Sequence, residues 1–180
     1  MVDSDGWSRA QRRLHGISSG LVFLTFGLGW LMVGRPADSL LLTFVVYQIH
    51  KTFGLLVLVL LVWRLAERMR VGRPAWDAMP AWQSRGAAAM HLVLLVLLCV
   101  VPVLGYLTAA TAPGGVPTVF LGMVPVPNLV GRDPAWFAVL RPTHRALAIV
   151  LVALAVAHAA MAIHHHRMGK RTLVRMWLGR

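Results

Sequence analysis

The sequence has 180 residues, of which 58% are hydrophobic and only 13% are charged, and its mean hydropathy is +0.68. Soluble domains carry nearer a quarter charged residues, so this composition excludes an ordinary soluble domain and predicts lipid as the surroundings. The formal net charge of +12 comes without a soluble basic module, so nucleic acid is not an expected partner. Cys99 is the only cysteine, which excludes an intrachain disulfide and a thiolate metal cluster.

The first apolar run follows a basic N-terminal segment. Arg9, Arg12 and Arg13 precede it, which resembles the opening of a signal peptide. The run from Gly16 to Gly34 is uncharged over 19 residues, longer than a usual signal sequence, and no small-x-small cleavage site follows it. We therefore expect an uncleaved first membrane span.

Four segments are long and apolar enough to cross a bilayer: about 14–33, 42–65, 87–110 and 140–163. A hydrocarbon core of about 30 Å needs about 20 residues in a helix, and lipid offers no partner for an open backbone. Residues 1–180 are therefore expected to form one all-α domain, a bundle of four transmembrane helices. Pro102 predicts a kink in the third span.

Three connections join these spans. The first, from Gly34 to Leu41, is short and predicts that the first two helices are antiparallel neighbours. The second, 68–86, holds Pro74 and Trp76 and is expected to be an interfacial loop. The third, 111–139, is rich in proline and glycine and is expected to be non-helical, where it could cap one membrane face.

The basic residues predict the orientation of the bundle. Thirteen lysines and arginines fall on the side of the N-terminus and five on the opposite side. Because basic residues collect on the cytoplasmic side, both termini are predicted to be cytoplasmic and the third connection to lie outside a bacterial inner membrane.

Histidines within the spans carry the strongest functional signal, because ionisable side chains in a membrane are costly and face the bundle interior. His144 and His158 are 14 residues apart, which in a helix is a rise of about 21 Å at nearly the same angle. By depth, His15 matches His158 near the inner surface and His50 matches His144 near the outer surface. Two opposed imidazoles on one haem iron leave no open position, an arrangement suited to electron transfer.

Basic residues next to these histidines are natural partners for the anionic haem propionates. They are Arg12 and Arg13 at the inner pair, and Lys51, Arg141 and Arg145 at the outer pair.

Two interpretations stay open for His91, which either donates a hydrogen bond to a neighbouring helix or lines a quinone pocket. The run of His164, His165 and His166 is interpreted as an interfacial cationic tail, because three adjacent helical residues cannot face one metal ion.

The chain resembles the bacterial cytochrome b561 family over nearly its full length. Residues 7–15, WSRAQRRLH, are similar to the family's aromatic-Ser-x-x-Gln-x-x-x-His start. Residues 48–54, QIHKTFG, followed by VWR at 62–64, resemble its second span. His91 leading to PVLGY at 102–106, and Thr143 before His144, resemble its third and fourth spans.

This resemblance implies two haems b, ligated by His15, His50, His144 and His158. It also implies a quinone partner, ubiquinone or another, in a pocket near the inner haem, where Arg9 and His165 occupy matching positions. Gly16 departs from the family, many members of which have tryptophan there, and this puts the shape of the pocket in doubt.

The function expected from these features is transmembrane electron transfer coupled to the quinone pool. One alternative is a superoxide:quinone oxidoreductase, which would make the chain an enzyme by itself. A second is an anchor subunit for a periplasmic redox protein that docks on the third connection. A histidine-based metal transporter is disfavoured, because the spans lack carboxylates.

Overall fold

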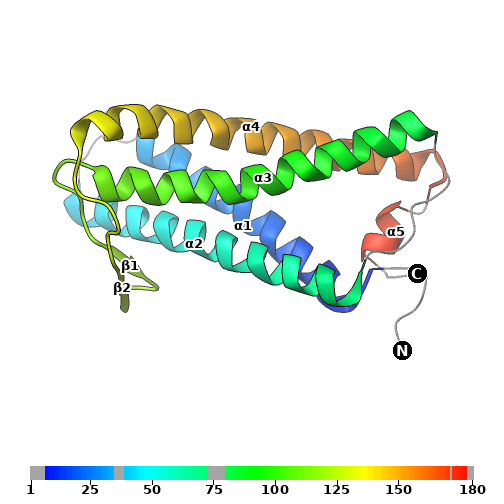
Figure 1. Cartoon of the computed structure of the whole chain (residues 1–180), viewed down its shortest axis with the longest axis horizontal. Coiled ribbons are helices and arrows are strands. Elements are labelled where there is room, and N and C mark those ends of the chain that lie inside the picture. Colours follow the sequence, from blue (N-terminus) through cyan, green and yellow to red (C-terminus); the bar gives the residue numbers. More distant parts are fainter. Residues whose placement is uncertain (1–6, 35–38, 73–79, 171, 178–180) are drawn as a thin grey trace.

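The computed structural model describes residues 7–34, 39–72, 80–170 and 172–177. Within this part of the chain, the structure contains four long helices, two short strands and one short helix, in the order α1 (Arg9–Gly34), α2 (Leu40–Val71), α3 (Ala81–Thr111), β1 (Thr118–Phe120), β2 (Val124–Val126), α4 (Pro134–Arg167) and α5 (Thr172–Trp177). All four long helices are long and apolar enough to cross a membrane. They run side by side in one elongated bundle (Figure 1), which confirms the predicted four-helix architecture.

The bundle has two distinct ends. The two strands lie at one end, where α1 and α3 end and α2 and α4 begin; we call this the hairpin end (Figure 1). α5 lies at the opposite end, where α1 begins and α4 ends; we call this the tail end. The orientation of these ends in the membrane stays a prediction. Arg35, Arg73, Arg171 and Arg180, which contributed to the count of basic residues, lie outside the described residues, as do Pro74 and Trp76.

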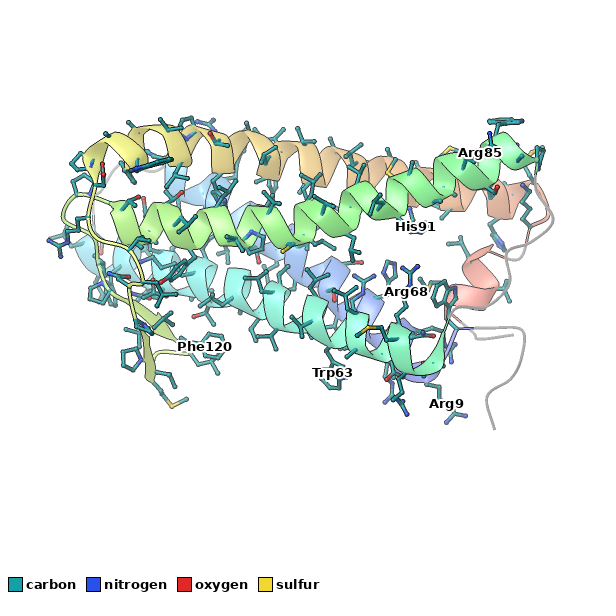
Figure 2. All side chains as sticks on the ribbon, in the orientation of Figure 1. Arg9, Trp63, Arg68, Arg85, His91 and Phe120 are labelled. Carbon is teal, nitrogen blue, oxygen red and sulfur yellow. The ribbon has the colours of Figure 1, made fainter. Side chains whose placement is uncertain are left out.

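A small apolar core holds the helices together at mid-height. Helix α1 packs mainly on α2 and α3 mainly on α4, and α2 joins the two halves through α3. The buried cluster contains Val22, Val57, Leu97, Val101 and Leu151, so every long helix contributes to it. Large apolar side chains also cover the outer surface, as does Trp63, which points away from the bundle (Figure 2). Such a surface suits a lipid environment.

The connections are shorter than the sequence predicts. Helix α4 begins at Pro134, six residues before the expected span, so the expected non-helical stretch up to Val139 was too long. The reason is an N-terminal cap: the Asp133 carboxylate accepts hydrogen bonds from the N–H groups of Ala135 and Trp136, and Pro134 suits the first helical turn. Helix α2 likewise continues to Val71, so the expected interfacial loop is shorter than 68–86.

The third connection contains a β-hairpin that the sequence did not predict. Strands β1 and β2 pair antiparallel, with Val119 opposite Pro125. The turn between them places Leu121 at φ 53° and Gly122 at φ 71°, and glycine adopts this left-handed region without strain. Side chains of α2 hold the hairpin against that helix, as described below.

Candidate functional site

Two pairs of histidine rings face each other inside the bundle, one toward each end. His50 of α2 and His144 of α4 form the hairpin-end pair, with ring centroids 6.3 Å apart and ring planes at 88°. His15 of α1 and His158 of α4 form the tail-end pair, with centroids 6.4 Å apart and planes at 84°. These are the two pairs that helix depth predicts, and their geometries are nearly identical.

The separation within each pair suits a metal ion held between two imidazoles. Metal–imidazole bonds are about 2.0–2.1 Å long, so opposed nitrogens lie about 4 Å apart and ring centres about 6 Å apart. The observed centroid distances of 6.3 and 6.4 Å agree with this value. Both pairs therefore fit a bis-histidine haem iron.

Backbone carbonyls orient the hairpin-end pair. Nδ1 of His50 lies 2.9 Å from the carbonyl oxygen of Thr25, and Nδ1 of His144 lies 3.0 Å from that of Val101. A carbonyl only accepts, so in each ring Nδ1 carries the proton and donates it. The lone pair is then left on Nε2, the atom that can bind a metal, and this hydrogen bond fixes the orientation of the ring.

Two glycines give these rings their space. A β-carbon on Gly29 would lie 3.0 Å from Cε1 of His50, and one on Gly105 would lie 2.9 Å from Cε1 of His144. Real β-carbons essentially never approach another atom as closely as at Gly105, and the contact at Gly29 would be tighter than nine in ten real ones. Sequence reasoning did not identify Gly29 and noticed Gly105 only within a motif, because each role depends on contact with a different helix.

An apolar cavity surrounds the hairpin-end pair. All four long helices and β1 contribute to its lining, which includes Gly54, one helical turn after His50. A β-carbon on Gly54 would meet no other atom within 4 Å among the described residues, so the space beside this turn is open. An apolar cavity with two convergent nitrogens is the environment that a flat, largely apolar macrocycle needs.

The tail-end pair has a different surrounding. Nη2 of Arg64 lies 3.2 Å from Nδ1 of His15. A guanidinium only donates, so in this arrangement Nδ1 of His15 accepts and its proton lies on Nε2. That is the reverse of the hairpin-end pair, and metal binding through Nε2 requires Arg64 to release this contact. Sequence reasoning used Arg64 as a topology signal and as part of a family motif, but did not place it beside His15, because 49 residues separate the two.

Of the predicted propionate partners, Lys51 lines the cavity that surrounds the hairpin-end pair. Lys51 donates a hydrogen bond through Nζ to the carbonyl of Val116, 2.9 Å away. Arg145 is exposed on α4. The guanidinium of Arg141 is also exposed and lies 5.9 Å from the centre of the Phe137 ring.

Arg12 and Arg13 lie at the start of α1, where Arg12 is half-buried and Arg13 is exposed. Arg12 precedes His15 by three residues, about one helical turn, and Arg13 precedes it by two.

Only one of the three quinone candidates lies beside a histidine pair. The ring of His91 is centred 5.1 Å from that of His158, and His91 extends from α3 toward α2, the helix that carries Arg68 (Figure 2). Arg9 is exposed and points away from the bundle (Figure 2). His165 is half-buried in the last turn of α4, where its carbonyl accepts the N–H of Lys170.

The two pairs are separated by the apolar core of the bundle. Leu151 lies seven residues from both His144 and His158, which is a rise of about 10 Å in each direction. The two candidate sites therefore lie at different depths, with the buried apolar cluster between them.

A membrane-spanning four-helix bundle with facing histidine pairs defines a membrane cytochrome of the b type. A model of the family described as prokaryotic cytochrome b561 matches residues 6–179. The chain belongs to this family, and it is therefore a haem-binding, multi-pass electron-transfer protein of the inner membrane.

Curated relatives agree with this assignment. The chain is 31% identical to cytochrome b561 homolog 1 of Escherichia coli (strain K12) over 176 residues, which cover 94% of this chain and 96% of the relative. It is also 31% identical to cytochrome b561 homolog 2 of the same organism over 170 residues, which cover 92% of this chain and 87% of that relative.

Proposed function

We propose that the chain holds two haems b, one at each histidine pair, and carries electrons between the two sides of the membrane. The observation that supports this most strongly is the repeated geometry, with ring separations of 6.3 and 6.4 Å and ring planes close to perpendicular. Each haem supplies an iron that gains and loses one electron, and two histidine ligands leave no position for a substrate on the metal.

The protein residues have separate tasks in this proposal. The carbonyls of Thr25 and Val101 fix the tautomer and orientation of His50 and His144. The apolar core keeps water away from the layer between the sites. Arg64 is the candidate partner for a haem propionate at the tail end, since a guanidinium binds carboxylates in bidentate fashion. If Arg64 moves from His15 to a propionate, Nδ1 of His15 is free to carry a proton and donate a hydrogen bond, and Nε2 is free to bind the iron.

Quinone is the proposed redox partner at the tail end. Support comes from His91, whose ring lies 5.1 Å from that of His158 and which is exposed enough to meet a ligand. An imidazole can hydrogen-bond a quinone oxygen and exchange a proton with it. The basic residues of the N-terminal side favour a cytoplasmic tail end, so this exchange would occur near the inner surface.

Reduction by a quinol tests this proposal. The haem-loaded protein, reconstituted in vesicles without oxygen, is mixed with a short-chain ubiquinol, and the reduced haem spectrum is followed. The His91→Ala variant should be reduced severalfold more slowly by quinol, yet normally by dithionite. Equal quinol rates in both proteins would remove His91 from the proposed quinone site.

Oxidation of superoxide at the hairpin end is a second candidate function. Each superoxide would give one electron to the cytochrome and leave as oxygen, and two electrons with two protons would convert a quinone to quinol. Exposed Arg141 and Arg145 on α4, beside His144 in the sequence, favour this candidate because they could attract an anion.

A further inference from the structure

The hairpin between α3 and α4 exposes an apolar, uncharged surface. No charged residue occurs from Ala109 to Gly131, although this segment leaves the helical bundle. Met123 is 76% exposed, and Leu121 and Val124 beside it are also exposed. A loop in water usually carries polar side chains at its tip, so this one needs another environment.

The hairpin is held firmly along one face of α2. Figure 1 shows both strands at the side of this helix, extending away from the bundle axis, and Figure 2 shows Phe120 there. The amide of Gln48 donates to the carbonyl of Pro117 over 2.7 Å and accepts the N–H of Val119 over 3.0 Å. Thr52, one turn further along α2, accepts the N–H of Leu121 through its hydroxyl over 3.3 Å.

These contacts satisfy two N–H groups on the edge of the hairpin that faces α2. The N–H groups of Val119 and Leu121 donate to α2 rather than to β2. Val119 directs its N–H away from β2, so the residue opposite it in this antiparallel pair directs its N–H away from β1, at the outer edge of β2. That residue is Pro125, which has no N–H. The hairpin therefore avoids unpaired donors at both of these positions, as a segment with little access to water must.

The same face of α2 is exposed and apolar on both sides of the hairpin. Phe44 lies one turn before Gln48, and Val59 lies two turns after Thr52; both side chains are exposed. Because α2 spans the membrane, this face contacts lipid. The hairpin covers this face of α2 between Phe44 and Val59, and its exposed apolar side chains extend the apolar surface of α2 to one side.

We propose that the hairpin lies in the membrane interface, at the boundary between headgroups and acyl chains of the leaflet at the hairpin end. Leu121, Met123 and Val124 contact the acyl chains, and the strands lie beside α2 as a lateral anchor. Such an anchor sets the depth of α2, and therefore of His50, relative to the bilayer. Lipid is the occupant, since the uncharged surface is continuous with the lipid-facing strip and offers no charge to pair with a protein partner.

Spin-label accessibility tests this placement. Cys99 is exposed and is first replaced by alanine, so that a nitroxide can be attached at Met123→Cys. Two further single-cysteine chains serve as references: Val59→Cys for lipid and Arg132→Cys, in the same connection, for water. Each haem-loaded protein is reconstituted in vesicles of phosphatidylethanolamine and phosphatidylglycerol. Electron paramagnetic resonance then measures collisions with oxygen, which concentrates in lipid, and with a water-soluble nickel complex.

The ratio of oxygen to nickel collisions at Met123 should exceed that at Arg132 severalfold and approach that at Val59. Val124→Cys provides a second labelled position and should give the same result. A ratio at both positions equal to that at Arg132 would overturn the proposal, because the hairpin would then lie in water. Protection from both reagents would also overturn it, because a protein surface or a second copy of the chain would then cover the hairpin.

Discussion

A β-carbon on Gly105 would lie 2.9 Å from Cε1 of His144, so only glycine at position 105 leaves room for this imidazole. The two residues belong to different helices, α4 and α3. Close contact between them therefore couples the packing of the bundle to the position of a candidate haem ligand.

Substitution of this glycine should displace the ring. The Gly105→Ala variant is expected to lose much of the hairpin-end haem. The added methyl group would overpack the contact at a cost of about 1–3 kcal/mol, and the hydrogen bond from His144 to the carbonyl of Val101 limits how far the ring can move away. The haem content per chain measures the effect. Gly20→Ala is the matched control, since a β-carbon there meets nothing within 4 Å among the described residues. Full haem content in Gly105→Ala would contradict the proposed fit.

Removal of single histidines should separate the two sites. His50→Ala and His144→Ala should each abolish binding of the hairpin-end haem. His15→Ala and His158→Ala should each abolish binding of the tail-end haem, because each iron needs both ligands. Potentiometric titration followed by absorption spectra distinguishes the two haems. His91→Ala should keep both. The pairing is wrong if His50→Ala and His158→Ala remove the same haem.

The sequence was sufficient for these pairs because helix geometry is regular. A fixed rise per residue converts the 14-residue spacing of His144 and His158 into depth, and alternating helix direction then matches His15 and His50 to them. The number and type of the long helices followed from span length alone.

Contacts between distant residues could not be predicted in this way. The carbonyl partners of His50 and His144 belong to the backbone, which has no sequence signature. Arg64 reaches His15 only because α1 and α2 pack together. The hairpin is fixed by Gln48, 71 residues away from Val119, so its own short strands gave no clear signal.

Arg64 should influence the redox potential of the tail-end haem. Removing a cation beside a centre that gains an electron destabilises the reduced state, so Arg64→Gln is expected to lower that midpoint potential. The shift should be tens of millivolts, since a tenfold change in a one-electron equilibrium corresponds to about 59 mV. Redox titration measures it. Arg85→Gln is the control, because Arg85 is exposed at the same end. Equal potentials for Arg64→Gln and the unmodified chain would exclude this role.

The exposed arginines on α4 should raise the rate of reduction if the electron donor is an anion. Arg141 stacks near Phe137 rather than toward the histidines, so Arg141→Gln should leave the haems in place. Stopped-flow reduction by superoxide is expected to be slower in this variant, and in the unmodified chain it should fall as ionic strength rises. A rate that responds neither to the substitution nor to salt would remove the support for superoxide oxidation and leave quinone-linked electron transfer.

The haem content of the purified protein tests the central claim most directly. A pyridine haemochrome assay, combined with quantitative amino-acid analysis, gives the number of haems b per chain. Two histidine pairs with nearly the same ring separation and interplanar angle predict two haems b per chain. A value of one or none in fully loaded protein would contradict the proposal that both pairs bind haem.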